Sequence, residues 1–122
     1  MRRKLALLTA PVLLVLPTAA LGSAAAGTVA PTAAQRAAIV KGFGDPKAAS
    51  PCLTVRLAAS DHHWASVQPK LTHSCLRYAF DGVNALEQVS TSRWKVVFEG
   101  SSYRCPVAHV PRQVQRDLRI CR

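Results

Sequence analysis

Residues 52–67 read CLTVRLAASDHHWASV, and the periodicity of this stretch indicates the fold class. Apolar and polar side chains alternate over residues 53–57, which is the pattern of a half-buried β-strand. Residues 60–63 have the composition of a turn, after which residues 64–67 can return as an antiparallel neighbour. The stretch therefore predicts a β-hairpin that begins a larger sheet.

Three further strands are expected after this hairpin. Residues 76–80 alternate again and lead into Asp81-Gly82, a dipeptide that suits the positive φ values of a type I′ turn. Residues 83–89 should pair back on them. Residues 90–92 break the pattern, and residues 94–98 then alternate as a fifth strand.

A helix is expected on either side of these strands. Thr32 and Gln35 have the spacing of a capping box, which predicts a helix over residues 33–43. Pro111 suits the first position of a short C-terminal helix. The apolar stripe of that helix consists of Val110, Val114, Leu118 and Cys121. The order predicts an α+β domain, a small antiparallel sheet of about five strands with the N-terminal and the short C-terminal helix covering one face.

The first 26 residues have the organisation of a secretory signal peptide. A positive segment, Arg2 to Lys4, precedes a short apolar one, and Ala24 to Ala26 are small residues suited to cleavage. The apolar segment is shorter than the roughly 20 residues of a spanning helix, so no integral membrane association is expected after cleavage. The sequence thus predicts a signal peptide over 1–26, a flexible mature N-terminus over 27–31 and a single disulfide-stapled domain over 32–122. The mature protein is expected to be secreted, either extracellular or associated with the cell wall.

The cysteines Cys52, Cys75, Cys105 and Cys121 are expected to form two disulfides, because an exported protein meets an oxidising environment. Four cysteines allow three pairings. The local pairing, Cys52 with Cys75 and Cys105 with Cys121, is favoured, since it would tie the sheet together and join the last helix to the preceding loop. A metal site would need thiolates clustered at spacings such as Cys-x-x-Cys, which the chain lacks, so no metal is expected.

The chain is strongly basic. It contains 16 Lys and Arg against 6 Asp and Glu, a formal charge of +10, and loss of the three basic residues of the signal peptide would leave +7. Such a charge favours anionic partners, which outside a cell include envelope polymers and secreted acidic proteins. The candidate anion-binding residues Arg112, Arg116 and Arg119 share one face of the predicted C-terminal helix. Nucleic acid is not expected as a partner, because aromatic residues are not interleaved with the basic ones.

No motif assigns a catalytic, cofactor-binding or metal-binding residue. Ser101 follows Gly100 but belongs to neither Gly-x-Ser-x-Gly nor Ser-x-x-Lys, and the acidic residues are scattered rather than paired. His62 and His63 beside Asp61 form the densest polar cluster, on a turn where adjacent histidines tend to point apart. We therefore expect a non-enzymatic binding or envelope-associated protein without cofactors. The alternatives are a secreted protease inhibitor and a small secreted hydrolase using His62, His63 or Ser101.

The segment from Trp94 to Pro106 resembles a group of short exported actinobacterial proteins of unassigned function. It is followed by Val110-Pro111, Arg116-Asp117-Leu118 and Cys121, and residues 64–67 fit the same pattern. The resemblance implies a small secreted domain with disulfides and assigns no functional residue. The subtilisin-inhibitor-like proteins are similar in size, in export and in having two disulfides, but this chain lacks their clustered cysteine loop.

Overall fold

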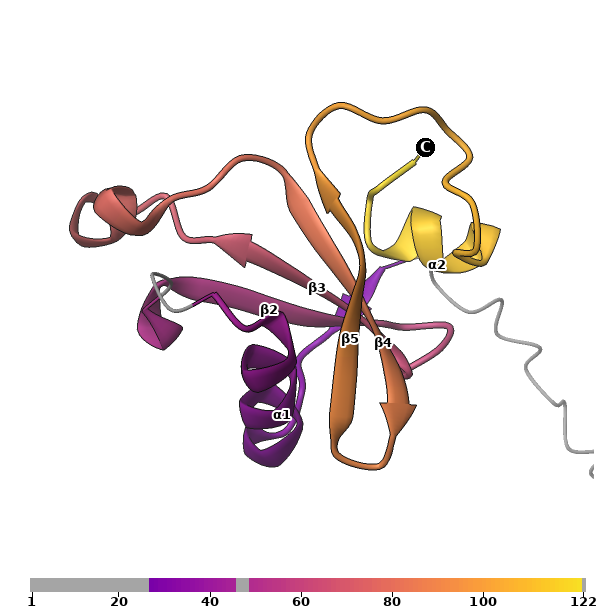
Figure 1. The fold of residues 1–122 in the computed structure, drawn as a ribbon, viewed down its shortest axis with the longest axis horizontal. Helices are drawn as coiled ribbons and strands as arrows, with labels where there is room; N and C mark the ends of the chain where they lie inside the picture. Colours follow the sequence, from indigo (N-terminus) through magenta and orange to yellow (C-terminus); the bar gives the residue numbers. More distant parts are fainter. Residues whose placement is uncertain (1–26, 46–48, 122) are drawn as a thin grey trace, which may run out of the picture.

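A five-stranded antiparallel sheet organises the part of the chain that the structure, a computed structural model, describes: residues 27–45 and 49–121 (Figure 1). The strands lie side by side in sequence order: β1 Thr28–Val29, β2 Leu53–Ala58, β3 Trp64–Pro69, β4 Val83–Ser90 and β5 Arg93–Gly100. The helices are α1 Ala33–Phe43 and α2 Arg112–Asp117, with short 3₁₀ helices η1 Ser50–Cys52 and η2 His73–Tyr78. The α+β fold class is confirmed. The predicted signal peptide, residues 1–26, lies outside the described residues.

Helix α1 begins and ends where the sequence predicts. The Gln35 amide donates to the Thr32 hydroxyl at 3.2 Å, and the Thr32 amide donates to the Gln35 side-chain oxygen at 2.8 Å, which completes the capping box. The helix stops at Gly44, whose φ of 68° is left-handed. Both ends are therefore specified by local sequence.

The first strand was not expected. Thr28 pairs with Ala58 and Val29 with Leu57, so the expectation of a flexible segment over residues 27–31 is wrong for these two residues. The edge of β2 offers unpaired backbone groups, and this short segment satisfies some of them. A strand of two residues has no periodicity from which to predict it.

The predicted strand over residues 76–80 is wrong. This region forms η2 and the segment after it, with Cys75 buried and Leu76 53% exposed, so the alternation does not mark a sheet face. Asp81-Gly82 consequently closes no hairpin, and β4 pairs instead with β3 and β5. Gly82 has a φ of 79°, and a Cβ there would collide with the Gly100 carbonyl. This glycine allows β4 to start close against the end of β5.

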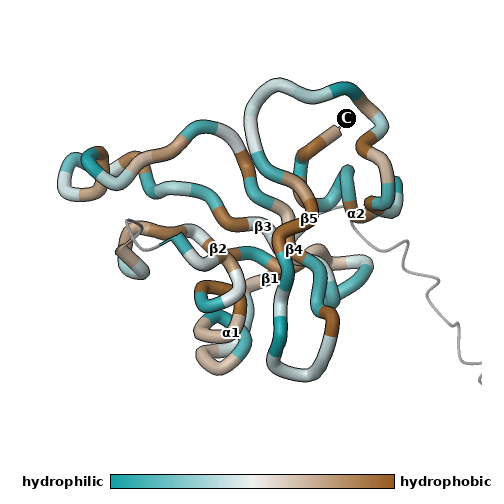
Figure 2. The backbone as a smooth tube through the Cα atoms, in the orientation of Figure 1, coloured by the Kyte–Doolittle hydropathy of each residue, from teal (hydrophilic) through white to brown (hydrophobic). Residues whose placement is uncertain are grey.

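The two helices cover opposite faces of the sheet, which corrects the expectation that both lie on one face. Consecutive residues of a strand point to opposite faces. Leu57 belongs to the hydrophobic cluster around α1, whereas Ala58 belongs to the cluster around α2. Apolar residues (brown) lie in the central strands between α1 and α2 (Figure 2). Helix α2 buries the second face of the sheet, where Trp64, Val83 and Ala85 are apolar as well.

A register shift in β5 divides its aromatic residues between these faces. Ala85 pairs with Phe98 but Leu86 pairs with Val96, which leaves Val97 as an extra residue. Trp94 and Val96 therefore pack on the α1 side, while Phe98 packs on the α2 side. The simple alternation expected for residues 94–98 is wrong at this bulge.

Two disulfides join Cys52 to Cys75 and Cys105 to Cys121, with Cα atoms 5.3 and 5.9 Å apart. This is the local pairing that the sequence favours. The first bridge connects the start of β2 with η2, and the second connects the segment after β5 with the segment after α2. Their loops span 23 and 16 residues. Each bridge contributes about 3 kcal/mol in the chain-entropy treatment.

Candidate anion-binding surface

Helix α2 presents its arginines because its other face is anchored in the core. Val110, Val114 and Leu118 are buried against the sheet, as the apolar stripe predicts. Arg112 and Arg116 are exposed and lie four positions apart, hence on one face of the helix. Pro111 lies just before the helix as its cap, one position earlier than expected.

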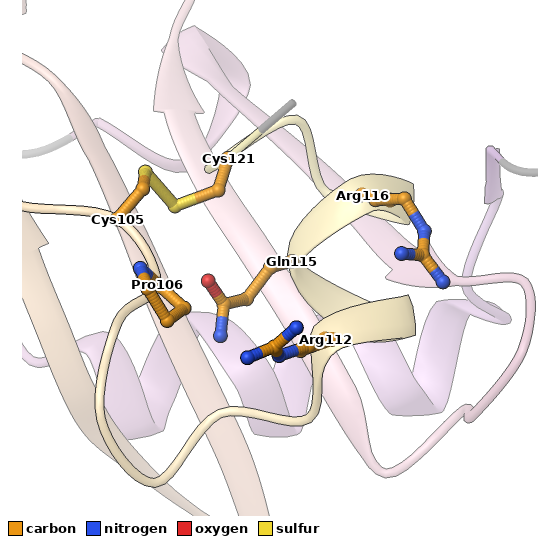
Figure 3. A pocket seen from close by; sticks show the side chains of 6 residues that line it. All are labelled: Cys105, Pro106, Arg112, Gln115, Arg116 and Cys121. Atoms are coloured by element: carbon orange, nitrogen blue, oxygen red, sulfur yellow. A yellow bond between two sulfur atoms is a disulfide. The ribbon is translucent and has the colours of Figure 1, made fainter.

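Arg112 and Arg116 line a surface depression of about 300 Å³ (Figure 3). The rest of its lining consists of Cys105, Pro106, Gln115 and Cys121. In Figure 3 the Arg112 guanidinium lies near Gln115, whereas the Arg116 side chain points away from Pro106, so the two guanidinium groups diverge although their backbone positions share one helix face. Within the described residues neither arginine forms an ion pair, although Arg116 donates to the Gln113 side-chain oxygen at 2.5 and 3.2 Å. These two guanidinium groups therefore remain open to an anionic ligand.

Gln115 fixes the wall of this depression. Its side chain accepts from the Val107 amide at 2.9 Å and donates to the carbonyls of Val107 and Val110 at 2.9 and 2.6 Å. The side chain is 2% exposed. Its polar atoms are thus occupied by the loop over residues 107–110, so Gln115 positions the site while the arginines provide its charge.

Arg119 is separated from the other two predicted arginines. The amides of Ile120 and Cys121 donate to the Gln115 carbonyl at 2.9 and 3.3 Å, and Arg119 adopts a left-handed φ of 56°. The chain reverses at this point, as at many helix ends. The helical face expected to hold Arg112, Arg116 and Arg119 therefore contains the first two, and Arg119 lies at a different groove.

This second groove, of about 410 Å³, brings Arg119 together with Arg56 of β2. Arg56 pairs with Ser66, and Thr54 pairs with Gln68, so these four polar side chains form a block across β2 and β3 on one face of the sheet. The remaining lining comes from Gly27, Thr28, Asp117 and Leu118. Two guanidinium groups beside hydroxyl and amide groups suit a ligand with several anionic oxygens. Arg56 was not among the predicted anion-binding residues, although strand alternation places it on the face opposite Val55 and Leu57.

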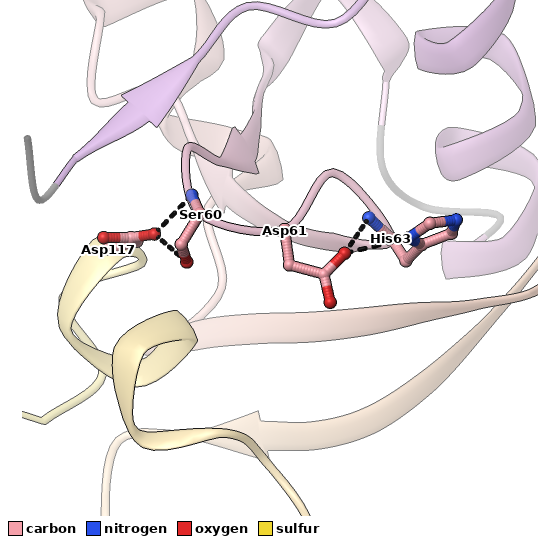
Figure 4. A network of polar contacts seen from close by, with 4 residues as sticks. All are labelled: Ser60, Asp61, His63 and Asp117. Atoms are coloured by element: carbon pink, nitrogen blue, oxygen red, sulfur yellow. Dashed lines mark hydrogen bonds and ion pairs between the residues drawn. The ribbon is translucent and has the colours of Figure 1, made fainter. Parts of the chain in front are cut away.

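Asp117 is the acidic member of this groove, and its side chain is 1% exposed. Its carboxylate accepts hydrogen bonds from the Ser60 backbone amide at 2.8 Å and from the Ser60 hydroxyl (Figure 4). It also accepts from the Gly27 backbone amide at 3.1 Å and from the Gln113 side-chain amide at 3.0 Å. Burial by itself would raise the pKa of Asp117, but these hydrogen bonds outweigh it and lower the pKa below its ordinary value. Asp117 forms no ion pair with a described arginine, so it does not occupy the guanidinium groups of Arg56 and Arg119.

The cluster at the β2–β3 turn contains a hydrogen-bonded pair, His63 and Asp61. The ring of His63 contacts the Asp61 carboxylate at 2.8 Å (Figure 4). Burial would raise the pKa of Asp61, but hydrogen bonds from His63 and the charges of His63 and His62 lower it overall. The His63 side chain is 71% exposed, so the pair lies in solvent. Within the described residues no group of three or more His, Cys, Asp or Glu could hold a metal ion.

Ser101 lies far from these histidines. Gly100 pairs with Val83 at the start of β4, whereas the Gln88 amide donates to the His63 carbonyl at 2.8 Å. Val83 and Gln88 are five residues apart on one strand, which separates the two positions by about 16 Å. The structure thus does not bring together the residues of the hydrolase alternative.

Comparison of the chain with protein-family models, curated proteins and solved structures found no match. No helix among the described residues is long and apolar enough to span a membrane. The two disulfides are compatible with an extracellular protein.

Proposed function

We propose that this protein is a secreted, non-enzymatic binding module that associates with an anionic polymer of the cell envelope. The observation that carries the proposal is the exposed pair Arg112 and Arg116, which line one depression without an ion-pair partner among the described residues. Guanidinium groups bind phosphate and carboxylate through charge-assisted, often bidentate hydrogen bonds. The resemblance to short exported actinobacterial proteins supports the secretion of the chain and does not bear on what it binds.

The charge of the chain supports the same partner. Without residues 1–26 the formal charge is +7. A positive field attracts polyanions over distances of about 10 Å at moderate salt. Arg56 and Arg119 provide a second pair of guanidinium groups next to α2. A polymer with repeated charges can contact both pairs, and its binding is then stronger than that of a single anion.

The test is elution of the oxidised protein from immobilised poly(glycerol phosphate) by a sodium chloride gradient. The variant Arg112→Gln/Arg116→Gln removes two charges at the depression, and Arg93→Gln/Lys95→Gln removes two exposed charges on β5. Glutamine keeps most of each side chain, so packing by the aliphatic stems is largely retained. We expect the first variant to elute at clearly lower salt than the second. Equal elution of the two variants would mean that binding follows net charge alone and would contradict the proposed site.

Further measurements test the second groove, the type of anion that is bound and the protease-inhibitor alternative. Arg56→Gln/Arg119→Gln shows whether the second groove contributes, and polyglutamate in place of the phosphate polymer shows whether carboxylates are bound equally well. A protease inhibitor would instead form a discrete complex with a secreted protease that resists high salt. Such a complex, without retention on either polymer, would replace the proposed function.

A further inference from the structure

The backbone at Gly27 is held at both of its polar atoms. Its carbonyl accepts from the Ala59 amide at 3.0 Å, and its nitrogen donates to the Asp117 carboxylate at 3.1 Å. The pairing of Thr28 with Ala58 fixes the following residue. The start of β1 is thus docked against the end of α2, although the two are 90 positions apart in the chain.

The Asp117 carboxylate is a buried acceptor with an unusual set of donors. All four hydrogen bonds to it come from neutral groups of Gly27, Ser60 and Gln113. Arg56 and Arg119 line the same groove but form no ion pair with Asp117. A buried charge normally has a partner of opposite sign, because removal from water is costly. Asp117 lacks such a partner among the described residues.

The sequence places a cleavage point beside this carboxylate. Ala24 and Ala26 occupy the two small-residue positions of a signal-peptidase site, and the bond after Ala26 leads into Gly27. We propose that cleavage occurs between Ala26 and Gly27, and that the new terminal ammonium of Gly27 forms an ion pair with the buried Asp117 carboxylate. This inference rests on the export proposed above. Hydrolysis consumes one water and leaves a carboxylate on Ala26 and an ammonium on Gly27.

The position of the cut determines whether the pair forms. Cleavage after Ala26 puts the positive charge on the nitrogen that already lies 3.1 Å from the Asp117 oxygen. Cleavage after Ala25 would put the charge one residue, about 3.5 Å, further along the chain and leave a neutral amide at Gly27. Of these two cuts, only the one after Ala26 places the terminal charge at the Asp117 carboxylate. Processing would then stabilise the mature domain as well as release it.

The charged groups around this pair come from three elements. Arg56 lies on β2, Arg119 follows α2, and Asp61 follows Ser60 in the β2–β3 turn. Arginines remain protonated throughout the range of interest. Asp61 stays ionised in neutral and alkaline solution, because its pKa is lowered. A change in stability around pH 8 would therefore belong to the Gly27 amine, whose ordinary pKa as a chain terminus is about 7.7–8.0.

The experiment compares the mature chain, residues 27–122, with a free and with an acetylated Gly27 amine. The described part of this chain contains both hydrophobic clusters and both disulfides. Acetylation keeps the N–H donor and removes the charge. At pH 7 we expect it to lower the melting temperature by at least about 4 °C. The decrease in melting temperature on acetylation should be less than half as large in Asp117→Asn. Mass analysis of the protein secreted from the full chain should give Gly27 as its first residue.

A pH series keeps the test decisive if Asp117→Asn does not fold. Pairing raises the folded pKa of the amine, so its stabilisation is complete below the unfolded pKa and is lost as pH rises through the folded value. The difference between free and acetylated protein should accordingly vanish in alkaline solution. No difference at pH 7, an equal shift in Asp117→Asn, or a secreted chain that starts elsewhere would overturn the inference. None of these results depends on binding to a polyanion, so a failure here is distinct from a failure of the proposed function.

Discussion

At the level of single residues, Asp117 illustrates how opposing effects decide a protonation state. Burial favours the neutral acid, but hydrogen bonds from Ser60, Gly27 and Gln113 favour the carboxylate and prevail. The folded pKa is therefore lower than the value of about 3.9 for an unperturbed aspartate. The side chain joins β1, the β2–β3 turn and α2.

This balance predicts an acid-dependent loss of stability. A depressed folded pKa gives stability that is complete above the unfolded pKa and is lost as pH falls through the folded value. We expect the melting temperature of Asp117→Asn to lie below that of the wild type at pH 6 and the gap to narrow below about pH 4. Glu99→Gln, an exposed site on β5, serves as the control. Thermal unfolding between pH 2 and pH 6 checks this, and a gap independent of pH would contradict the assigned role.

At the level of secondary structure, the elements with local signals could be predicted and those set by distant partners could not. The capping box and Gly44 specify α1, and alternation with a turn specifies the β2–β3 hairpin. Residues 76–80 alternate too, but Cys75, which is bonded to Cys52, lies in the 3₁₀ helix η2, which continues to Tyr78. β1 exists through its pairing with β2, a contact that no local pattern reveals.

In the candidate site, too, features with a local sequence signal could be predicted and features set by distant contacts could not. Arg112 and Arg116 could be placed together from helical spacing. Arg119 could not, because hydrogen bonds to the Gln115 carbonyl turn the chain after Leu118. Its proximity to Arg56 depends on how α2 docks on the sheet, which needs the complete topology.

The close approach of β4 and β5 gives a prediction about glycine. Gly82 and Gly44 have similar φ values, 79° and 68°, but a Cβ would collide with backbone only at Gly82. Gly44→Ala should cost about 1 kcal/mol through its left-handed backbone alone. Gly82→Ala should cost about 1–3 kcal/mol more, since the Gly100 carbonyl must also move. Urea unfolding of both variants measures the difference, and equal losses would contradict this packing.

Considered in full, the described domain combines a core on both faces of a thin sheet with two covalent bridges and a basic surface. α1 and α2 each cover one face, and the Cys105–Cys121 bridge holds the two segments that flank α2. A small domain gains stability from such bridges because its core is limited. This frame leaves Arg112 and Arg116 exposed on α2, where they are accessible to a repeated anionic partner.

The decisive measurement is a nuclear magnetic resonance titration of the isotope-labelled, oxidised protein with short poly(glycerol phosphate). The proposed function predicts that amide resonances change around α2, with Arg112 and Arg116 foremost and the groove of Arg56 and Arg119 following. The changes should reverse on addition of salt. Changes centred on the β2–β3 turn, or none anywhere, would contradict a binding surface on α2.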